Sequence, residues 1–347
     1  MSKNKTEIFG TLGPSCKDKQ VLREMLEEGM TGIRLNMSHT SLHKSAEWLN
    51  SYREAQRLTG IKADLLIDLQ GPELRIEAPE RELQLKEGAA VILKEKGCAD
   101  NGDGIRLDTR IFSAIEIGDT ILLNDGAIEL TADGYKDAGR SICARVVRGG
   151  ALSGRKSIKI VGKSVAMPVL TEQDLENIGC ARQYGVTALM QPFVTSGEQL
   201  RQIREILGEK GLAGEGGLRI FAKIESREGA KALPDILPWA DVIVIARGDL
   251  GNDVPLWELP ALQKQIAAAC RECGKPFLVV TQMLTSMISN AVPTRAEVSD
   301  IFNAVEDGAS AVMVTNETAV GKYPVEVIRY LKKTCQCAET WQIGKKL

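Results

Sequence analysis

Charged residues come directly after two short apolar runs in the middle of the chain. Lys223 and Glu225 follow the first run, and Arg247 and Asp249 follow the second. Each run has strand length and lacks helical periodicity, which is typical of a strand buried on both faces of a parallel sheet. Because a buried charge needs a partner or a ligand, we expect these side chains to face one site. The two carboxylates predict a divalent cation beside the ammonium of Lys223.

Polar residues also end other apolar runs of strand length. They are Arg34, Asn36 and Ser38 after one run, Asp68 and Arg75 after the next, and Thr281 and Glu317 after two later runs. Arginine and lysine bind phosphate, whereas carboxylate, amide and hydroxyl oxygens bind hard cations. The set therefore predicts an anionic substrate held together with metal ions. Gly248, which precedes Asp249, predicts a turn whose backbone N–H groups approach a carboxylate or a phosphate.

The order of the apolar runs predicts the fold that positions these residues. Runs of strand length alternate with amphipathic helical segments, and they lie at residues 8–14, 31–36, 63–68, 188–193, 219–222, 242–246, 277–281 and 311–315. This rhythm is typical of an α/β protein with a (β/α)8 TIM barrel. Since barrel enzymes build their sites at the C-terminal ends of the strands, we expect the polar residues to meet at one mouth.

The rhythm changes after the third run. Residues 77–167 contain short, partly alternating apolar runs that are separated by turn signals rich in glycine, asparagine and aspartate. This pattern predicts an all-β domain inserted after strand 3 of the barrel. We therefore expect barrel parts at 1–76 and 168–347 and a β domain at 77–167.

Composition narrows the class of protein. With 347 residues, 44% of them hydrophobic, and a formal net charge of −2, the chain is typical of a globular protein that coats neither nucleic acid nor membrane. Its apolar runs are shorter than a transmembrane helix and its start lacks a signal-peptide core, so we expect a cytoplasmic location. Eight scattered cysteines predict reduced thiols, and two histidines argue against a zinc site or a Ser-His-Asp triad.

Groups of residues along nearly the whole chain resemble, in the same order, those of one known family. They are Thr11 to Pro14, Arg34 to His39, Asp68 with Gly71-Pro72-Glu73, Leu123 to Gly126, Lys223-Ile224-Glu225, Ala246 to Gly251, Thr281 to Leu284, Pro293 to Glu297, and Glu317-Thr318. The family is pyruvate kinase. The resemblance implies a TIM barrel whose β lid excludes water, and transfer of the phosphoryl group of phosphoenolpyruvate to ADP, giving pyruvate and ATP.

The resemblance also implies metal ligands. Glu225 and Asp249 would bind Mg²⁺, which bridges the phosphate and the carboxylate of the substrate. The residues that would bind K⁺ are Asn36, Ser38 and Asp68, and Glu73 resembles the potassium-dependent branch of the family.

The remaining matches imply roles toward substrate and nucleotide. Lys223 would stabilise the transferring phosphoryl group and the enolate, and Arg34 would hold the phosphate. Thr281 would lie near the carbon that is protonated, with Gly248 and Asp249 also at the substrate. The residues that match positions near the nucleotide are His39 and Arg75.

The chain departs from the family pattern in the loops around this set. It has Leu69-Gln70 where the family has Thr-Lys, and Asn316 where the family has Gly. After strand 4 it has Gln191-Pro192-Phe193-Val194-Thr195 where the family has a Ser-Phe-Val/Ile-Arg pattern. In the return from the β insert a lysine of the family is moved or lost, and Lys163 is the nearest. The match ends after the eighth helix, so we expect a short form without the family's C-terminal effector domain.

Several hypotheses follow from these departures. One is a pyruvate kinase; another is a paralogue that acts on a related 2-oxo acid enolate; a third is a regulatory protein that binds phosphoenolpyruvate and has weak catalysis. A homo-oligomer formed through the barrel is compatible with each. Taken singly, Glu225 and Asp249 fit salt bridges with Lys223 or Arg247 better than a metal site, because ion-pair networks are commoner than metal sites. The agreement of six strand ends favours the functional interpretation.

Overall fold

Two compact units make up the protein. The computed structural model describes residues 6–38, 40–71, 74–77, 79, 81–97, 104–124, 126–154, 156–163, 165 and 168–344, apart from the side chain of residue 343. The first unit, called the barrel unit below, contains Met1–Gly71 and Val169–Leu347. The second, called the β unit, contains Pro72–Pro168.

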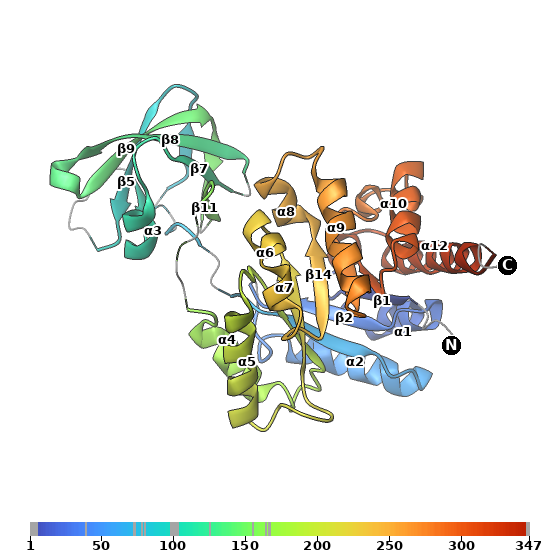
Figure 1. The fold of residues 1–347 in the computed structure, drawn as a ribbon. Coiled ribbons are helices and arrows are strands. Elements are labelled where there is room, and N and C mark those ends of the chain that lie inside the picture. The colour runs from blue at the N-terminus through green and yellow to red at the C-terminus, as the bar shows by residue number, and fades with distance from the viewer. Residues whose placement is uncertain are drawn as a thin grey trace. The chain divides into compact units, whose positions relative to one another are not determined.

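The barrel unit contains a closed barrel of parallel strands (Figure 1). In order around the barrel they are β1 (Glu7–Thr11), β2 (Gly32–Asn36), β3 (Asp64–Asp68), β12 (Ala188–Gln191), β13 (Arg219–Ile224), β14 (Val242–Ala246), β15 (Phe277–Val280) and β16 (Ala311–Met313). The last strand pairs with the first, at Glu7↔Ala311. The prediction of a (β/α)8 barrel is confirmed.

Strand residues face alternately into and out of the barrel, and both sides are buried. Along β14, Val242, Val244 and Ala246 belong to the apolar cluster inside the barrel. Ile243 and Ile245, on the opposite face, belong to the cluster between strands and helices. Burial on both faces explains why the run is apolar throughout.

Packing inside the barrel requires glycine at one position, residue 32. The rings of Phe9 and Phe221 meet edge to face, with centroids 6.3 Å apart and an interplanar angle of 75°. At Gly32, which begins β2, a Cβ atom would lie 2.1 Å from the ring of Phe9. The ring therefore occupies the space that any other residue at this position needs.

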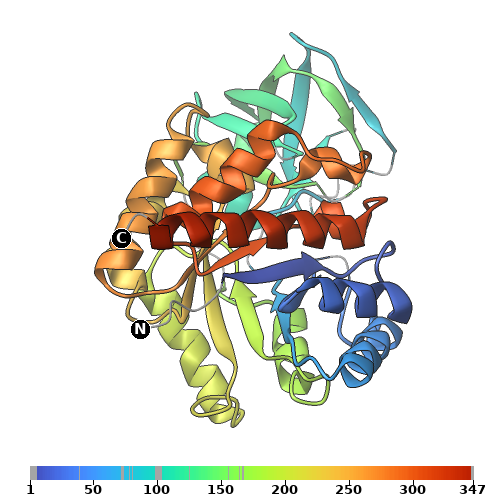
Figure 2. The same cartoon turned by 90° about the vertical axis from the view of Figure 1, so that its right-hand side faces the viewer.

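Helices surround the barrel and connect its strands (Figures 1 and 2). Those described are α1 (Lys19–Glu28), α2 (Ala46–Thr59), α4 (Glu172–Cys180), α5 (Gly197–Glu209), α6 (Arg227–Lys231), α7 (Leu233–Ile236), α8 (Arg247–Asp253), α9 (Leu259–Glu272), α10 (Arg295–Glu306), α11 (Asn316–Ala319) and α12 (Pro324–Gly344), with the 3-10 helix η2 (Thr285–Ile288). The long α12 lies beside α1, where Arg329 is 2.7 Å from Glu28 (Figure 2). Within the described part of the chain, no helix is both long and apolar enough to cross a bilayer.

The β unit has its own sheets and its own apolar core. The strands of its larger sheet, in spatial order, are β11 (Ile158–Ile160), β7 (Thr120–Leu123), β8 (Ile128–Lys136), β9 (Ser141–Arg148), β5 (Ala90–Glu95) and β6 (Ile105–Leu107), and β10 (Gly150–Leu152) pairs with β4 (Leu83–Leu85). The expectation of strands alone misses one short helix, α3 (Thr109–Ala114), and a 3-10 turn, η1 (Asp137–Gly139). Asp108 caps α3 by accepting a hydrogen bond from Arg110 N, and that cap promotes the helical turn.

One buried carboxylate of the barrel unit holds both ends of the chain that lead to the β unit. Asp174, near the start of α4, accepts hydrogen bonds from Gln70 N at 2.8 Å and Gly71 N at 3.0 Å. It also accepts hydrogen bonds from Thr171 N at 3.0 Å and Thr171 Oγ1 at 2.8 Å. Thr171 in turn is the N-cap of α4, in a capping box. The outgoing and returning chains are thus tied at one point.

Candidate active site

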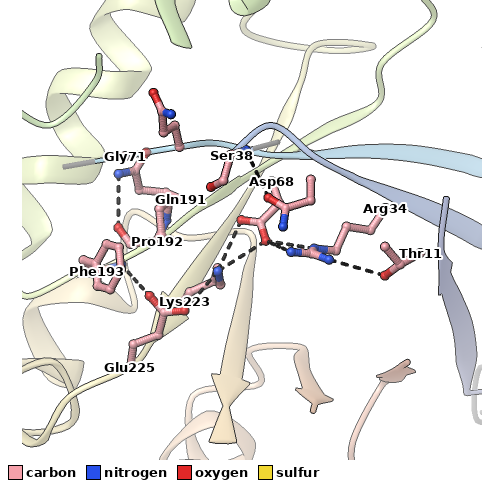
Figure 3. Close-up of polar contacts among 12 residues, drawn as sticks. Thr11, Arg34, Ser38, Asp68, Gly71, Gln191, Pro192, Phe193, Lys223 and Glu225 are labelled. Carbon is pink, nitrogen blue, oxygen red and sulfur yellow. Dashed lines mark hydrogen bonds and ion pairs between the residues drawn. The ribbon is translucent and has the colours of Figure 1, made fainter. Parts of the chain in front are cut away.

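Four charged side chains from β2, β3 and the end of β13 form a row toward the C-terminal ends of the barrel strands (Figure 3). Nζ of Lys223 is 3.3 Å from both oxygens of Asp68 and 2.9 Å from Oε1 of Glu225. On the other side, Oδ2 of Asp68 accepts Nε of Arg34 at 2.8 Å and lies 2.6 Å from its Nη2. The charges therefore alternate in sign along the row.

The row is buried, and this shifts the protonation of its members. Burial opposes ionisation of Asp68, but the positive charges of Lys223 and Arg34 outweigh burial and hold its pKa below the usual range. Burial likewise disfavours the charge on Lys223, yet the carboxylates of Asp68 and Glu225 raise its pKa. The centre of the row is thus a fixed set of charges at neutral pH, two of which are cations.

Glu225 is the member of the row whose charge is least compensated. Its Oε2 accepts a hydrogen bond from Phe193 N at 2.8 Å. Its Oε1 faces Lys223 but accepts no directional hydrogen bond from the described residues. Burial raises the pKa of Glu225 to about 7, Lys223 lowers it, and the negative charge of Asp249 adds to the rise. Two carboxylates that disfavour each other's charge suit a divalent cation.

The described residues do not provide a complete metal cage. No group of three or more His, Cys, Asp or Glu side chains among them has the arrangement of a metal site. Mg²⁺ commonly binds through one or two carboxylates and completes its shell with water and substrate oxygens. Glu225 and Asp249 fit that pattern, so the residues present are compatible with Mg²⁺.

The oxygens assigned to K⁺ are already in use in this structure. Oδ1 of Asn36 accepts a hydrogen bond from Ser38 N at 3.1 Å, and Asp68 compensates two cations. The residues still present hard oxygen donors, which suits K⁺ chemically. His39 and Glu73 lie outside the described residues. Arg75 belongs to the β unit, where it forms an isolated β-bridge with Ser157.

The segment after β14 is a helix, and the expectation of a glycine turn is wrong. Arg247 begins α8, and neither Gly248 nor Gly251 has a positive φ. The guanidinium of Arg247 donates to Thr281 O and pairs with Asp300 of α10. Gly248 lies beside Thr281, because a Cβ on it would be 3.5 Å from Thr281 Cγ2. The strand ends of β14 and β15 are therefore joined at this point.

Two residues singled out in the sequence have structural partners. The buried carboxylate of Glu317 accepts a hydrogen bond from Thr315 N at 2.7 Å, at the start of α11. The ammonium of Lys163 lies 2.6 Å from Glu116 and 2.8 Å from Asp119, within the β unit. Each of these side chains therefore contacts partners within its own unit.

Gln191 directly precedes the position of the family's serine, which is Pro192 here, and ends β12. Its Nε2 donates to Pro192 O at 3.2 Å (Figure 3) and to Val169 O at 3.1 Å. Its Oε1 is buried and accepts no hydrogen bond from the described residues. Gly71 lies next to it, since a Cβ there would be 2.4 Å from Pro192 Cγ. Gly71 directly follows the departure at Leu69-Gln70, and Leu69 N donates to Met190 O, so this departure lies next to the one that begins at Gln191.

Sequence reasoning missed the residues that act through tertiary contacts. Phe193 contributes a backbone N–H to Glu225, and its φ of +55° has no sequence signal in a phenylalanine. Thr11 contributes Oγ1 at 3.4 Å from Nη1 of Arg34. Asp300 lies on an amphipathic helix, where an acidic residue is ordinarily a solvated surface charge.

Comparisons with known proteins agree with this geometry. A family model described as pyruvate kinase, barrel domain, matches residues 3–328. A pyruvate kinase of Bacillus licheniformis is 34% identical over 345 residues, covering 99% of this chain and 58% of the relative. One of Geobacillus stearothermophilus is 35% identical over 329 residues, covering 94% of this chain and 56% of the relative.

A solved structure extends the agreement to three dimensions. The crystal structure of a pyruvate kinase from Cryptosporidium parvum superposes with a TM-score of 0.89 at 30% identity, covering 98% of this chain and 70% of that one. The chain spans a little over half the length of the two curated relatives named above. Because the family model covers most of its residues, this chain belongs to the pyruvate kinase family.

Proposed function

We propose that the barrel mouth transfers the phosphoryl group of phosphoenolpyruvate to ADP, giving pyruvate and ATP. The observation that carries this proposal is the buried row of alternating charges, Arg34, Asp68, Lys223 and Glu225, in a member of the pyruvate kinase family. Such a row offers two fixed cations to a phosphate in a place of low water content. Fixed charges there stabilise developing negative charge more strongly than they would in water.

The two cations have different roles in the proposal. Arg34 holds the phosphate of the bound substrate with its planar guanidinium, which matches phosphate oxygens in pairs. Lys223 stabilises charge on the phosphoryl group in transfer and then on the enolate oxygen that is left. Asp68 keeps both cations oriented. The enolate gains a proton at carbon near Thr281, with Gly248 and Asp249 beside the substrate.

Metal ions belong to the same proposal. Glu225 and Asp249 would hold Mg²⁺, and Asn36, Ser38 and Asp68 would hold K⁺. When bound, these ions supply positive charge to the phosphate and carboxylate oxygens of the substrate. The raised pKa of the Glu225 carboxyl, to which the charge of Asp249 contributes, supports the magnesium part. His39 and Arg75 remain predicted nucleotide residues.

The test is turnover of phosphoenolpyruvate and ADP at high enzyme concentration with Mg²⁺ and K⁺. We expect pyruvate and ATP in equal amounts, and loss of both after removal of Mg²⁺ by a chelator. Lys223→Met should reduce kcat by about 10²- to 10³-fold, because it removes a charge that acts in the transition state. Substrate binding should change much less.

Other outcomes separate the alternatives. Metal-dependent binding of phosphoenolpyruvate without pyruvate formation would support the regulatory protein instead. Turnover of a different enolate would support the paralogue. A Lys223→Met variant with nearly full turnover would contradict the role assigned to Lys223.

A further inference from the structure

Two consecutive residues after β15 have a backbone conformation that is rare outside glycine. Thr281 has a φ of +76° and Gln282 a φ of +54°. For a β-branched threonine this left-handed conformation brings the side chain against its own backbone. Such strain persists only where surrounding contacts impose it, and it gathers at functional sites.

Arg247 contacts the strained residue directly. Its Nε and Nη2 both donate to the carbonyl of Thr281, at 3.2 Å and 2.6 Å. Its Nη1 lies 2.8 Å and 2.7 Å from the two carboxylate oxygens of Asp300. The guanidinium is buried, with 9% of the side chain exposed. One side chain therefore links the strained carbonyl after β15 to α10.

The geometry points to Arg247 as a positioning residue: it holds Thr281 in the left-handed conformation that directs its side chain toward Gly248 and the substrate. This inference rests on the proposed function, in which Thr281 lies beside the enolate carbon. Arg247 touches no reacting atom in this role, because its donors are committed to Thr281 O and Asp300.

The role requires an arginine. A guanidinium presents its donors in a rigid planar fork, so it reaches a carbonyl on one side and a carboxylate on the other. An ammonium is a single centre on a flexible stem. Arg247→Lys keeps the positive charge beside Asp300 but cannot reproduce both contacts.

The experiment is a double-mutant cycle of Arg247→Lys and Thr281→Ala. The first readout is kcat for pyruvate formation. The second is exchange of the pyruvate methyl protons with D₂O, followed by ¹H NMR. In this exchange a methyl C–H bond breaks to give the enolate and solvent receives the proton, after which a deuteron from D₂O forms the new C–D bond.

We expect each single variant to lose about 10- to 100-fold in both rates, since a small misplacement of a positioned group has effects of that size. The double variant should lose no more than Thr281→Ala alone, because both changes remove the same function. The Michaelis constant for ADP should stay within about twofold in all three variants.

A matched control is Arg204→Lys. Arg204 also donates to a backbone carbonyl, Trp239 O, and to a carboxylate, Asp241 Oδ1, both at 2.9 Å. It lies on α5, outside the charge row. We expect its kcat to remain within about twofold of the unchanged protein.

Each result decides the inference. Losses that multiply in the double variant, or full rates for Arg247→Lys, overturn it while the proposed function stands. If Arg247→Lys does not fold, Asp300→Asn takes its place in the cycle, with a smaller loss expected because the bonds to Thr281 O remain.

If the unchanged protein shows no turnover, the proposed function is overturned. The affinity for phosphoenolpyruvate is then measured for the same set of variants in place of kcat. Additive losses of affinity, or no binding at all, overturn the inference as well.

Discussion

Asp68 balances two buried cations at once. Its carboxylate lies within ion-pair distance of both Arg34 and Lys223, and it is itself almost fully buried. Without it, two positive groups would face each other in a medium of low dielectric. Asp68 therefore stabilises the site without a ligand, in addition to any role it has when a ligand is bound.

Asp68→Asn tests this. The substitution keeps the shape but removes the charge, so we expect the free energy of unfolding to fall by about 3 kcal/mol, as when one partner of a buried ion pair is lost. The pKa of Lys223 should fall, since the carboxylate of Asp68 helps to raise it. Denaturant unfolding at pH 7 measures the first effect.

Glu54→Gln is the matched control. Glu54 lies 3.2 Å from Lys19 on the surface, where an ion pair contributes less than about 1 kcal/mol. Equal effects of the two substitutions would contradict the structural role of Asp68.

At the scale of single residues, the sequence could predict which charged residues belong to the site but not which residues they pair with. Arg34, Asp68, Lys223 and Glu225 were recognisable because each stands at or near a strand end, and the structure brings them into one row. Asp300 was not recognisable, because only the fold shows that a carboxylate on α10 pairs with the guanidinium at the start of α8.

Among the elements, the start of α10 is held by an unusually well-bonded carboxylate. Glu297 accepts hydrogen bonds from Ser286 N at 2.7 Å, Ser286 Oγ at 2.6 Å, and Thr294 N and Oγ1 at 2.8 Å each. Burial alone would raise its pKa, but these hydrogen bonds outweigh burial and lower it. The carboxylate thereby fixes the loop between η2 and α10.

This gives a prediction for pH. A carboxyl whose pKa is lower in the folded state than its unfolded value of 4.5 stabilises the protein above that value. That stability is lost as the pH falls through the lower folded pKa. Relative to Glu297→Gln, the unchanged protein should be more stable by on the order of 1 kcal/mol at pH 7, and the difference should shrink toward pH 3.

Urea unfolding at a series of pH values measures this difference. Glu47→Gln, on the exposed first turn of α2, serves as the control. A constant difference for Glu297→Gln across the series would contradict the assigned role.

Element boundaries show where sequence patterns reach their limit. The run expected to end at residue 222 continues in β13 to Ile224, so Lys223 is a strand residue. A lysine there is tolerated because Asp68 and Glu225 receive its charge, which no local pattern reveals. The glycines of α8 suggested a turn, yet the segment is helical with Arg247 anchored at its start. Tertiary contacts outweigh local preference in both cases.

At the scale of the whole molecule, the two units have separate apolar cores. The ends at Gly71 and Thr171 donate to the same oxygen of Asp174, at 3.0 Å each. The two chain ends are therefore close together. A linker of two or three residues, at about 3.3–3.6 Å per residue, is long enough to connect them.

We therefore expect the barrel unit to fold without the β unit. A variant in which Gly-Ser-Gly replaces residues 72–168 should keep a cooperative thermal transition and helical circular dichroism. Adding Asp174→Asn to this variant should lower its stability, because the buried N–H groups of Gln70 and Gly71 lose their acceptor. Aggregation or a non-cooperative transition in the first variant would contradict the independence of the barrel unit.

The molecular scale was also where the sequence was most informative. Eight apolar runs with helical segments between them leave few alternatives to a closed parallel barrel, because each strand must bury both faces. The short helix α3 escaped notice in the β unit, since six residues are too few for helical periodicity to emerge.

Closure of the barrel between its first and last strands sets an order of events during synthesis. β1 pairs with β16 at Glu7↔Ala311, so about 300 residues must be translated between the two partners. At a translation rate of about 5–20 residues per second, one edge of β1 remains unpaired for roughly 15–60 s. The β unit, a contiguous segment with its own core, emerges well before that wait ends. Nascent chains that are halted after the β unit but before residue 311 should therefore carry a folded β unit and an open barrel. Chaperones should bind the exposed strand edges of that barrel.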